Sequence, residues 1–536
     1  MKSAFFSRLG AVAFLTCTAI SSTAKASSVT EQLHVSGNLA PSTALTEERS
    51  KAISPDLLVE SLERLQKEIK ARGIPIKLDQ AIAIGLENNP TLSKNYALLQ
   101  AREWKLIASQ RAWYPQISIT NLQSPSYTWT SFIRDEYGNA GEFYSQNPKP
   151  NSKARADRSQ NRASSGQRFI FNPNIKVAWR FLDPSRQPSI NAQEASLRQQ
   201  QYIFLSSARS LILEIQKSYF RVQSTAQLIS SFQKIYTNNR IELETIEARK
   251  EIGMATVLEV EQIRSQLFTN LSQLIGYTRN YITETAELSE LIALSPDAIA
   301  IPSEPAAPFG AWSKPLEDTI VEAISQREEL LAALAQAESS KWLGVSEMRR
   351  YLPVFSLAGN GSLTGTNGYQ EVPLSNDPGT SYQASRNWST SIAIEFEWQL
   401  FDGGIKAANA QSSFANSRGY LADKTIKENE VIRQVRASYG QLLTAKVAIE
   451  SSRQGYQSAQ LAEQAAKARY EVGVENITTV VQATARVSQT SVQLADSILN
   501  HNNAIADLYR YTSTWPSDTK GKVDQRLMNM REEGNQ

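Results

Sequence analysis

The sequence predicts a mixed fold, mainly α-helical with a membrane β-barrel, built from one repeat that occurs twice. The repeat runs helix, two strands, very long helix, helix. Three observations predict it: a duplicated sequence, helical apolar stripes of unusual length, and strands with one apolar and one polar face. A repeat of this size is one supersecondary unit used twice, so both copies are expected to have the same fold.

The duplication is visible as matching segments at a nearly constant separation. The shift is 238 residues early in each copy, and 219 to 220 residues later on. The shift therefore changes almost wholly between Pro115 and Asp183, which marks this stretch as a place of loop variation. The matching pairs are Leu78–Ile82 with Leu316–Ile320, Trp113–Gln116 with Tyr351–Val354, Trp179–Asp183 with Trp398–Asp402, and Ala248–Gly253 with Ala468–Gly473.

The chain begins with a segment typical of secretory signal peptides. Lys2 and Arg8 are basic, Leu9–Ile20 is apolar, and Ala24–Ala26 resembles a cleavage site. A membrane anchor is the alternative, but about twelve apolar residues are too few to span a bilayer. The predicted organisation is 1–26 signal peptide, 27–77 linker and short helix, 78–300 first repeat, 301–315 linker, 316–515 second repeat and 516–536 flexible tail.

Composition argues against several functional classes. The net charge of +3 with mixed signs does not indicate nucleic-acid binding. The single cysteine, Cys17, lies in the signal segment, so a processed chain would hold no thiol for disulfides, metals or catalysis. His34 and His501 are the only histidines, which argues against a histidine-based metal site or triad. We therefore expect no cofactor, no metal and no catalytic residue.

The helices are predicted from apolar residues spaced by threes and fours. In the first copy they run from about Leu78 to Ala112, from Asn191 to Ile252 and from Ala255 to Ala293, and Pro115 ends the first. Each stripe alone fits an ordinary bundle core. At ~1.5 Å per residue, however, the long helix spans ~90–100 Å, so it needs partners along its whole length and forms a tube wall. A shorter helix at Asp56–Arg72 either packs on the body or contacts a partner.

The strands alternate with period two. Ile392, Ile394 and Phe396 alternate with Ala393, Glu395 and Glu397. Ile175, Val177 and Trp179 likewise alternate with Lys176, Ala178 and Arg180. In a soluble protein the apolar face would cover a core. In a membrane barrel it would face lipid, and the polar residues would face a wet lumen. These lumen candidates are Lys176, Arg180, Glu395 and Glu397.

Four strands cannot close a barrel, and lipid does not tolerate an open edge. Three copies would supply twelve strands and an opening, so a homotrimer is the smallest assembly expected to conduct. The connections Asp135–Ser165 and Thr366–Asn387 are interpreted as outward loops. The first carries a basic cluster that either attracts anions or is simply solvated, formed by Lys149, Lys153, Arg155, Arg158 and Arg162.

These residues together resemble the TolC-type outer-membrane efflux family, over about Leu78 to Ser513. The motifs are Asn88-Asn89-Pro90, Tyr114-Pro115-Gln116, Leu400-Phe401-Asp402-Gly403-Gly404, and the hairpin glycines Gly253 and Gly473. The resemblance implies a homotrimer with a twelve-stranded barrel in the outer membrane and an α-helical tunnel in the periplasm. It also implies passive export of small molecules or proteins from an inner-membrane efflux pump or ABC transporter through a periplasmic adaptor, in multidrug efflux or type I secretion.

The resemblance also implies that the hairpin tips dock the adaptor. The tip residues are Ile252, Gly253, Met254, Val472, Gly473 and Val474. The alternative is that each glycine only ends a helix in the left-handed conformation. Acidic residues that ring the tunnel end in the family are not reproduced here, so the constriction candidates are Glu259, Gln262, Glu475, Thr479 and Gln482, with Arg264 or Arg469 as partners.

Two other functional classes are weighed against the channel. A periplasmic coiled-coil adaptor or scaffold would never enter the membrane, but adaptors have one helical hairpin, whereas this sequence has two hairpins separated by strand pairs. A secreted enzyme would need a nucleophile with its base, a metal cluster or a phosphate-binding loop, and the sequence offers none of these.

Overall fold

The computed structural model describes residues 60–61, 64, 67–69, 71–120, 126–136, 160–373 and 378–514. The predicted signal peptide, most of the segment 27–77 and the C-terminal tail lie outside these residues. Residues 1–58 and 59–536 form separate units, and all described residues belong to the second.

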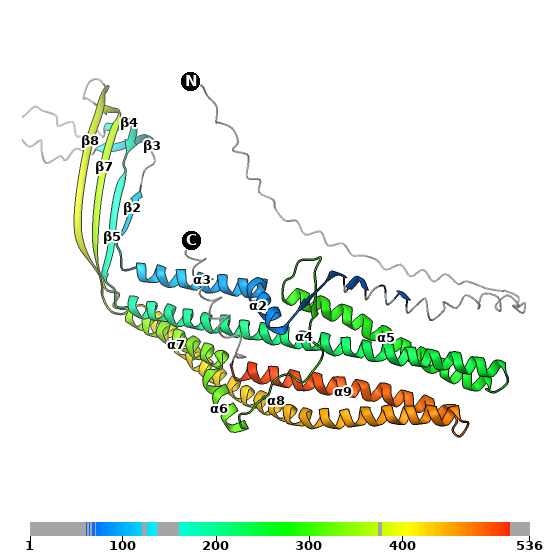
Figure 1. Ribbon diagram of the computed structural model, residues 1–536. Coiled ribbons are helices and arrows are strands. Elements are labelled where there is room, and N and C mark those ends of the chain that lie inside the picture. Colours follow the sequence, from blue (N-terminus) through cyan, green and yellow to red (C-terminus); the bar gives the residue numbers. More distant parts are fainter. Residues whose placement is uncertain are drawn as a thin grey trace, which may run out of the picture. The chain divides into compact units, whose positions relative to one another are not determined.

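Two copies of one element order make up the described chain (Figure 1). Each copy has two consecutive short helices, then strands, then a very long helix and a helix that returns along it. Apart from the second short helix, this is the order that the duplication predicts. The helices of the first copy are α2 (Leu78–Asn88), α3 (Pro90–Arg111), α4 (Arg186–Glu251) and α5 (Val257–Leu291). Those of the second are α6 (Leu316–Gln326), α7 (Glu328–Arg349), α8 (Ile405–Glu471) and α9 (Ile477–Tyr511).

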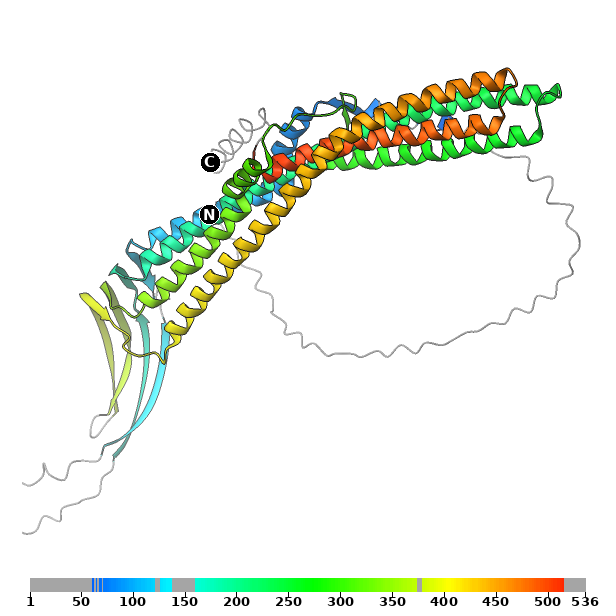
Figure 2. The same cartoon turned by 90° about the horizontal axis from the view of Figure 1, so that it is seen from below.

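The long helices organise the packing. Helix α4 has 66 residues and α8 has 67, so each is ~100 Å long at ~1.5 Å per residue. Helix α4 packs against α2, α3 and α5, and α8 packs against α6, α7 and α9 (Figures 1 and 2). The copies also pack on each other, because α4 contacts α7 and α9. Each long helix is therefore covered by shorter helices, as its length requires.

The predicted single helix Leu78–Ala112 is wrong, because the chain breaks at Asn89. Pro90 has no N–H and occupies the first position of α3, while the Asn89 side chain accepts hydrogen bonds from the N–H groups of Thr91 (2.9 Å) and Leu92 (3.2 Å). The Asn89 amide also donates to the Leu291 carbonyl at the end of α5, at 2.9 Å. This hydrogen bond connects the start of α3 to the end of α5. In the second copy, Arg327 occupies the corresponding position between α6 and α7.

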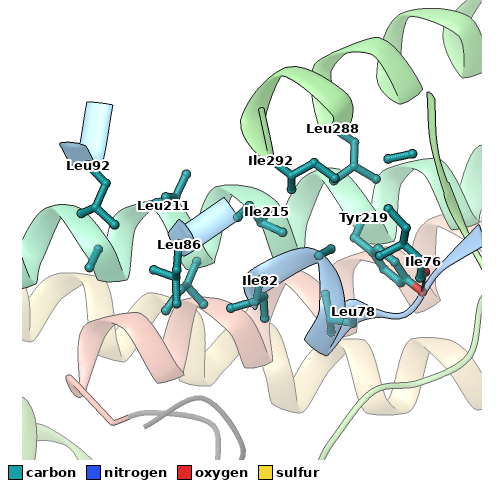
Figure 3. Close-up of a cluster of buried hydrophobic side chains, with 14 of the residues drawn as sticks. Ile76, Leu78, Ile82, Leu86, Leu92, Leu211, Ile215, Tyr219, Leu288 and Ile292 are labelled. Atoms are coloured by element: carbon teal, nitrogen blue, oxygen red, sulfur yellow. Dashed lines mark hydrogen bonds between the residues drawn. The ribbon is translucent and has the colours of Figure 1, made fainter. Parts of the chain in front are cut away.

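An apolar core fastens the first short helix to α4 (Figure 3). Ile82 of α2 and Ile215 of α4 are almost fully buried there, together with Ile292 after α5. Gly85 allows the close approach, because a Cβ at this position would lie 2.4 Å from Ile215 Cδ1. The Tyr219 hydroxyl donates to the Ile76 carbonyl at 3.1 Å. Ile76 belongs to β1 (Gly73–Ile76), which pairs in parallel with β6 (Ile299–Pro302).

The remaining strands form one antiparallel sheet with β7 (Val354–Pro373) in its middle. Strand β7 pairs with β8 (Pro378–Glu397) on one side, and with β5 (Asn174–Leu182) and β4 (Gln160–Phe171) end to end on the other. Strand β2 (Gln116–Thr120) then pairs with β5, and β3 (Ser126–Glu136) with β4. The six strands therefore follow four paths, the number that the sequence predicts.

The predicted loop boundaries are wrong, because the strands continue through them. Strand β3 reaches Glu136 and β4 begins at Gln160, while β7 and β8 extend to Pro373 and from Pro378. Arg162 therefore lies in a strand, and the other four residues of the predicted basic cluster lie outside the described residues. Polar side chains do not prevent pairing where the neighbouring strand satisfies them, and the hydroxyls of Thr366 and Ser385 hydrogen-bond across the ladder at 2.8 Å.

The strand register divides the sheet into a polar and an apolar face. One row across the four paths is Ser118, Lys176, Asn360 and Ser391. The adjacent row is Ile117, Val177, Gly359 and Ile392, and Trp179, Leu357 and Ile394 continue its face. Because successive residues point to opposite faces, the alternation within each strand gives the whole sheet one apolar and one polar face.

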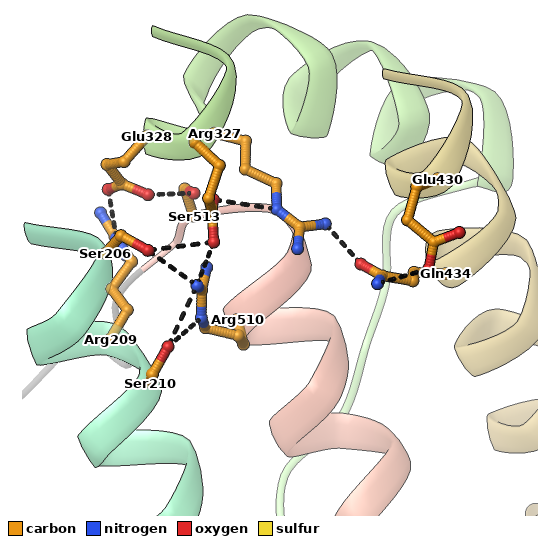
Figure 4. Close-up of polar contacts among 10 residues, drawn as sticks. Ser206, Arg209, Ser210, Arg327, Glu328, Glu430, Gln434, Arg510 and Ser513 are labelled. Carbon is orange, nitrogen blue, oxygen red and sulfur yellow. Dashed lines mark hydrogen bonds and ion pairs between the residues drawn. The ribbon is translucent and has the colours of Figure 1, made fainter. Parts of the chain in front are cut away.

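A buried ionic network joins the two copies at the start of α7 (Figure 4). Glu328 pairs with Arg209 of α4 at 2.5 Å, and Ser513 donates to it at 2.7 Å. Glu329 pairs with Arg327 at 3.1 Å and with Arg510 of α9. Burial alone would raise the pKa of Glu329, but the charges of Arg510 and Arg327 and the hydrogen bond from Arg510 lower it to about 2.

We predict that Glu329→Gln destabilises the protein at neutral pH by up to about 3 kcal/mol, since a lowered pKa means stronger interactions of the ionised form. The contribution is present above the ordinary pKa of 4.5 and is lost as pH falls toward about 2. Thermal unfolding of the two proteins in detergent at several pH values measures the difference, which should shrink below pH 4.5.

The matched control for this prediction is Glu338→Gln. Glu338 pairs with Arg198 at 2.6 Å, but both side chains are more than 40 % exposed, so the change should cost less than about 1 kcal/mol. Equal destabilisation by both variants, or a Glu329→Gln effect independent of pH, would contradict the assignment.

Candidate functional sites at the helical turns and on the polar face of the sheet

The two helix-to-helix turns have the same backbone structure. In the first, the N–H of Gly253 donates to the Lys250 carbonyl (3.0 Å) and that of Met254 to the Arg249 carbonyl (2.7 Å). In the second, Gly473 and Val474 make the corresponding bonds to Tyr470 and Arg469, both at 3.0 Å. This pattern is the Schellman motif, which requires a positive φ. Gly253 and Gly473 supply it, with φ of 78° and 77°.

Apolar side chains surround both glycines and are exposed. Ile252 and Met254 are 70 % and 74 % exposed, and Val472 and Val474 are 73 % and 66 % exposed. The turns lie at the same end of the helices (Figures 1 and 2), and the Arg249 guanidinium lies 5.6 Å from the centre of the Tyr470 ring. Two paired apolar tips on rigid helices are suited to docking another protein.

Glu259 and Thr479 occupy the same position, the third residue of the returning helix, and both take part in capping. The Glu259 carboxylate accepts from the Thr256 N–H (2.6 Å) and hydroxyl (2.9 Å), which completes a capping box. In the second copy Asn476 is the cap, and the Thr479 N–H donates to it at 3.1 Å. The difference between the copies at this position thus has a local structural reason.

The other constriction candidates are spread around the tips. Glu475 accepts from the Thr479 hydroxyl at 2.9 Å and lies 3.9 Å from Arg469. Arg264 instead pairs with Glu247 at 2.7 Å and with Glu261, so its charge is engaged within the first hairpin. Gln262 is half-buried and Gln482 is exposed. The described contacts do not join these residues into one cluster, and their role in a constriction stays a prediction.

The four lumen candidates lie on the polar face of the sheet. Lys176 pairs in register with Ser118 and Asn360, and Glu395 pairs with Ser356. Glu397 follows Glu395 by two residues and so shares its face, as Arg180 shares that of Lys176 next to an irregularity between Trp179 and Leu182. All four side chains are exposed.

The side-chain contacts inside the two junctions between strand and long helix were not predicted from the sequence. In the first, the Trp179 indole donates to the Trp113 carbonyl (2.8 Å), and Arg186 lies 4.5 Å from the centre of the Trp113 ring. In the second, the Trp398 indole donates to the Tyr351 carbonyl (3.0 Å), and Lys406 lies 5.3 Å from the centre of the Tyr351 ring. Trp179 and Trp398, which match between the two copies, were the sequence signal that could have indicated these contacts.

An aspartate fixes each junction. Asp183 accepts from the Ser185 N–H at 3.0 Å, and Asp402 accepts from the Gly404 N–H at 2.9 Å. The Lys406 N–H and the Tyr351 hydroxyl also donate to Asp402, and these hydrogen bonds lower the pKa of its carboxyl. Both aspartates therefore orient the first turn of a long helix.

The described residues contain no group of three or more histidine, cysteine, aspartate or glutamate side chains placed to hold a metal. Among the same residues, no helix is long and apolar enough to cross a membrane.

Comparison with known proteins finds one family over most of the chain. A family model described as "Outer membrane efflux protein" matches residues 82–294 and 319–514. The outer membrane protein TolC of Escherichia coli (strain K12) is 21 % identical over 419 residues, 77 % of each chain. TolC of Vibrio cholerae is 23 % identical over 353 residues, 64 % of this chain and 77 % of that protein.

Solved structures share the fold. A membrane protein from Pseudomonas aeruginosa has a TM-score of 0.63 and 18 % identity, over 82 % of this chain and 93 % of its own. The CmeC outer membrane channel of Campylobacter jejuni has a TM-score of 0.62 and 14 % identity, over 84 % and 89 %.

We predict that Gly473→Ala loosens the second turn. A left-handed conformation costs a residue with a side chain roughly 1–2 kcal/mol, and no atom lies near enough to the new Cβ to change that balance. Hydrogen exchange of the Gly473 and Val474 amides should therefore accelerate about fivefold or more.

Gly419→Ala is the matched control, because Gly419 lies inside α8 with equally open space around its Cα. Alanine in a helix is more favourable than glycine by roughly 0.5–1 kcal/mol, so this variant should slow local exchange. The same sign of effect for both variants would show that backbone conformation is not the cause.

Proposed function

Because the chain belongs to the outer membrane efflux protein family, we propose that it works as a homotrimer whose sheets close into one barrel above a helical tunnel. The chain is an outer membrane channel for export, with its helical part in the periplasm, and it is a transport protein rather than an enzyme. The trimer, its partners and the roles of individual residues are the proposed part.

The observation that carries the trimer is a sheet with an exposed apolar face and two free edges. Along the described residues, β8 pairs only with β7, and β2 and β3 form the opposite edge. Ile394 on the apolar face is 71 % exposed. In water a free edge beside an exposed apolar face favours pairing with another chain, and free edges are not tolerated in lipid. Further copies must pair with both edges, and three copies give twelve strands.

Native mass measurement after detergent extraction tests the assembly, and planar-bilayer recording tests conduction. We expect a trimer that forms discrete channels. A monomer in the soluble periplasmic fraction would refute the proposal.

The proposed partners are a periplasmic adaptor at the tips and, through it, an inner-membrane efflux pump or ABC transporter. The four exposed apolar residues beside Gly253 and Gly473 support this role, since each Schellman turn holds them outward on a rigid helix end. A trimer would present six such tips in a ring, to which the adaptor would bind.

We predict that Val474→Asp reduces adaptor capture at least tenfold without affecting the trimer, because a carboxylate in an apolar contact must lose its hydration. Crosslinking in cells from a position beside Gly473, followed by co-purification, measures capture. Val321→Asp on α6 is the control: Val321 is 67 % exposed, like Val474, and its substitution should leave capture unchanged. Unimpaired capture by Val474→Asp would exclude the second tip as the contact.

We predict opposite outcomes for two neighbouring residues of β8. Ile394→Arg should prevent membrane assembly, because a charge on the lipid face costs roughly 2–4 kcal/mol at mid-bilayer. Glu395→Arg should keep the trimer but shift its selectivity toward anions, since a lumen charge stays hydrated. Heat-modifiable gel mobility reports assembly, and reversal potentials in a salt gradient report selectivity. Equal tolerance of both would contradict the assigned faces.

A further inference from the structure

A cavity lies where the polar face of the sheet meets the first turns of the helices. It has a volume of about 710 Å³ and is bordered by both strand-to-helix junctions. Four cationic side chains line it, Arg180 and Arg186 from the first copy and Arg350 and Lys406 from the second, against the carboxylates of Asp183 and Glu397. Arg180 and Glu397 are also lumen candidates of the sheet, whereas Arg186, Arg350 and Lys406 come from the ends of helices α4, α7 and α8.

Arg186 is the feature that points to a ligand. Its side chain is buried, with 6 % exposure, and its Nη2 group donates to the Arg180 carbonyl. Its Nη1 group has no hydrogen-bond partner among the described residues. Stacking on Trp113 holds the guanidinium in place, at 4.5 Å from the ring centre. A buried guanidinium with a free donor is costly unless an acceptor satisfies it.

The surroundings favour an anionic acceptor. Arg186 is the first residue of α4, and the first turn of this 66-residue helix holds no acidic residue to offset the partial positive charge of its N-terminus. Asp183 is already engaged by the Ser185 N–H (3.0 Å) and hydroxyl (2.7 Å). Arg350 pairs with Glu347 at 2.9 Å, whereas no described ion pair involves Arg180.

We propose that this cavity binds the carboxylate, sulfonate or phosphate group of a soluble organic anion as it passes from the helical part to the sheet. Arg186 donates from the wall, the exposed Arg180 supplies a second positive charge, and the N-terminus of α4 adds its dipole. The inference rests on the proposed channel, because it places the polar face of the sheet along the export path. A soluble anion rather than a lipid headgroup fits this polar face, since the apolar face would meet lipid.

Pyranine, a pyrene carrying three sulfonates, is a suitable probe. Its fluorescence polarisation is measured with the detergent-solubilised full-length protein at low salt. We expect saturable binding that weakens with added KCl, and at least fivefold weaker binding for Arg180→Gln and for Arg186→Gln. Near-ultraviolet circular dichroism and native mass verify that the Arg186 variant is folded. Arg180, which is exposed, tests the site even if the Arg186 variant does not fold.

Arg418→Gln is the matched control, because it removes one exposed positive charge from α8 outside the cavity and should leave binding unchanged. No saturable binding, equal loss in the Arg418 control, or unaltered binding in the Arg180 variant would overturn the site. Phospholipid phosphate retained by the wild type and released by the Arg180 variant would also overturn it, in favour of a lipid.

Bilayer recording separates this inference from the function on which it rests. Wild-type channels that conduct without binding pyranine would refute only the anion site. Protein that binds pyranine but forms neither trimers nor channels would refute the proposed function.

Discussion

The structure depends on one constraint, which is that the buried stripes of two helices about 100 Å long must be covered throughout. Isolated helices gain little from their own hydrogen bonds in water, so tertiary packing must stabilise α4 and α8. No single short helix reaches far enough. In each copy, several shorter helices together cover the long helix. Helix α4 also buries residues against the other copy.

The stability of this cover depends on the residues at which the shorter helices meet, and these residues interact differently in the two copies. Asn89 joins α3 to α5 with neutral hydrogen bonds to Thr91, Leu92 and Leu291. Arg327 occupies the same place in the second copy and opens an ionic network with Glu329 and Arg510. The neutral joint is independent of pH, whereas the ionic joint needs an ionised Glu329 and ties α4 to the second copy through Arg209.

The sheet and the helices are connected by junctions that also line the cavity proposed to bind an anion. The rings of Trp113 and Tyr351 each contact a cation from the start of a long helix, Arg186 of α4 and Lys406 of α8. The same arrangement that fixes the direction of α4 leaves the Nη1 group of Arg186 without an acceptor among the described residues. The Arg186 side chain thus stabilises the junction and also supplies the donor for the proposed anion.

The sequence by itself determined the repeat, the lengths of the long helices, the glycine turns and the two faces of the strands, because each depends on local spacing or on one backbone conformation. It did not determine the packing of the break at Asn89 against α5, the true ends of β7 and β8, or the cavity beside Arg186. Asn89 and Pro90 encode the break locally, but its contact with α5 depends on a carbonyl 202 residues away, and the strand ends depend on partners across the ladder. The cavity exists only where both copies meet, so its charge follows from packing that no local pattern encodes.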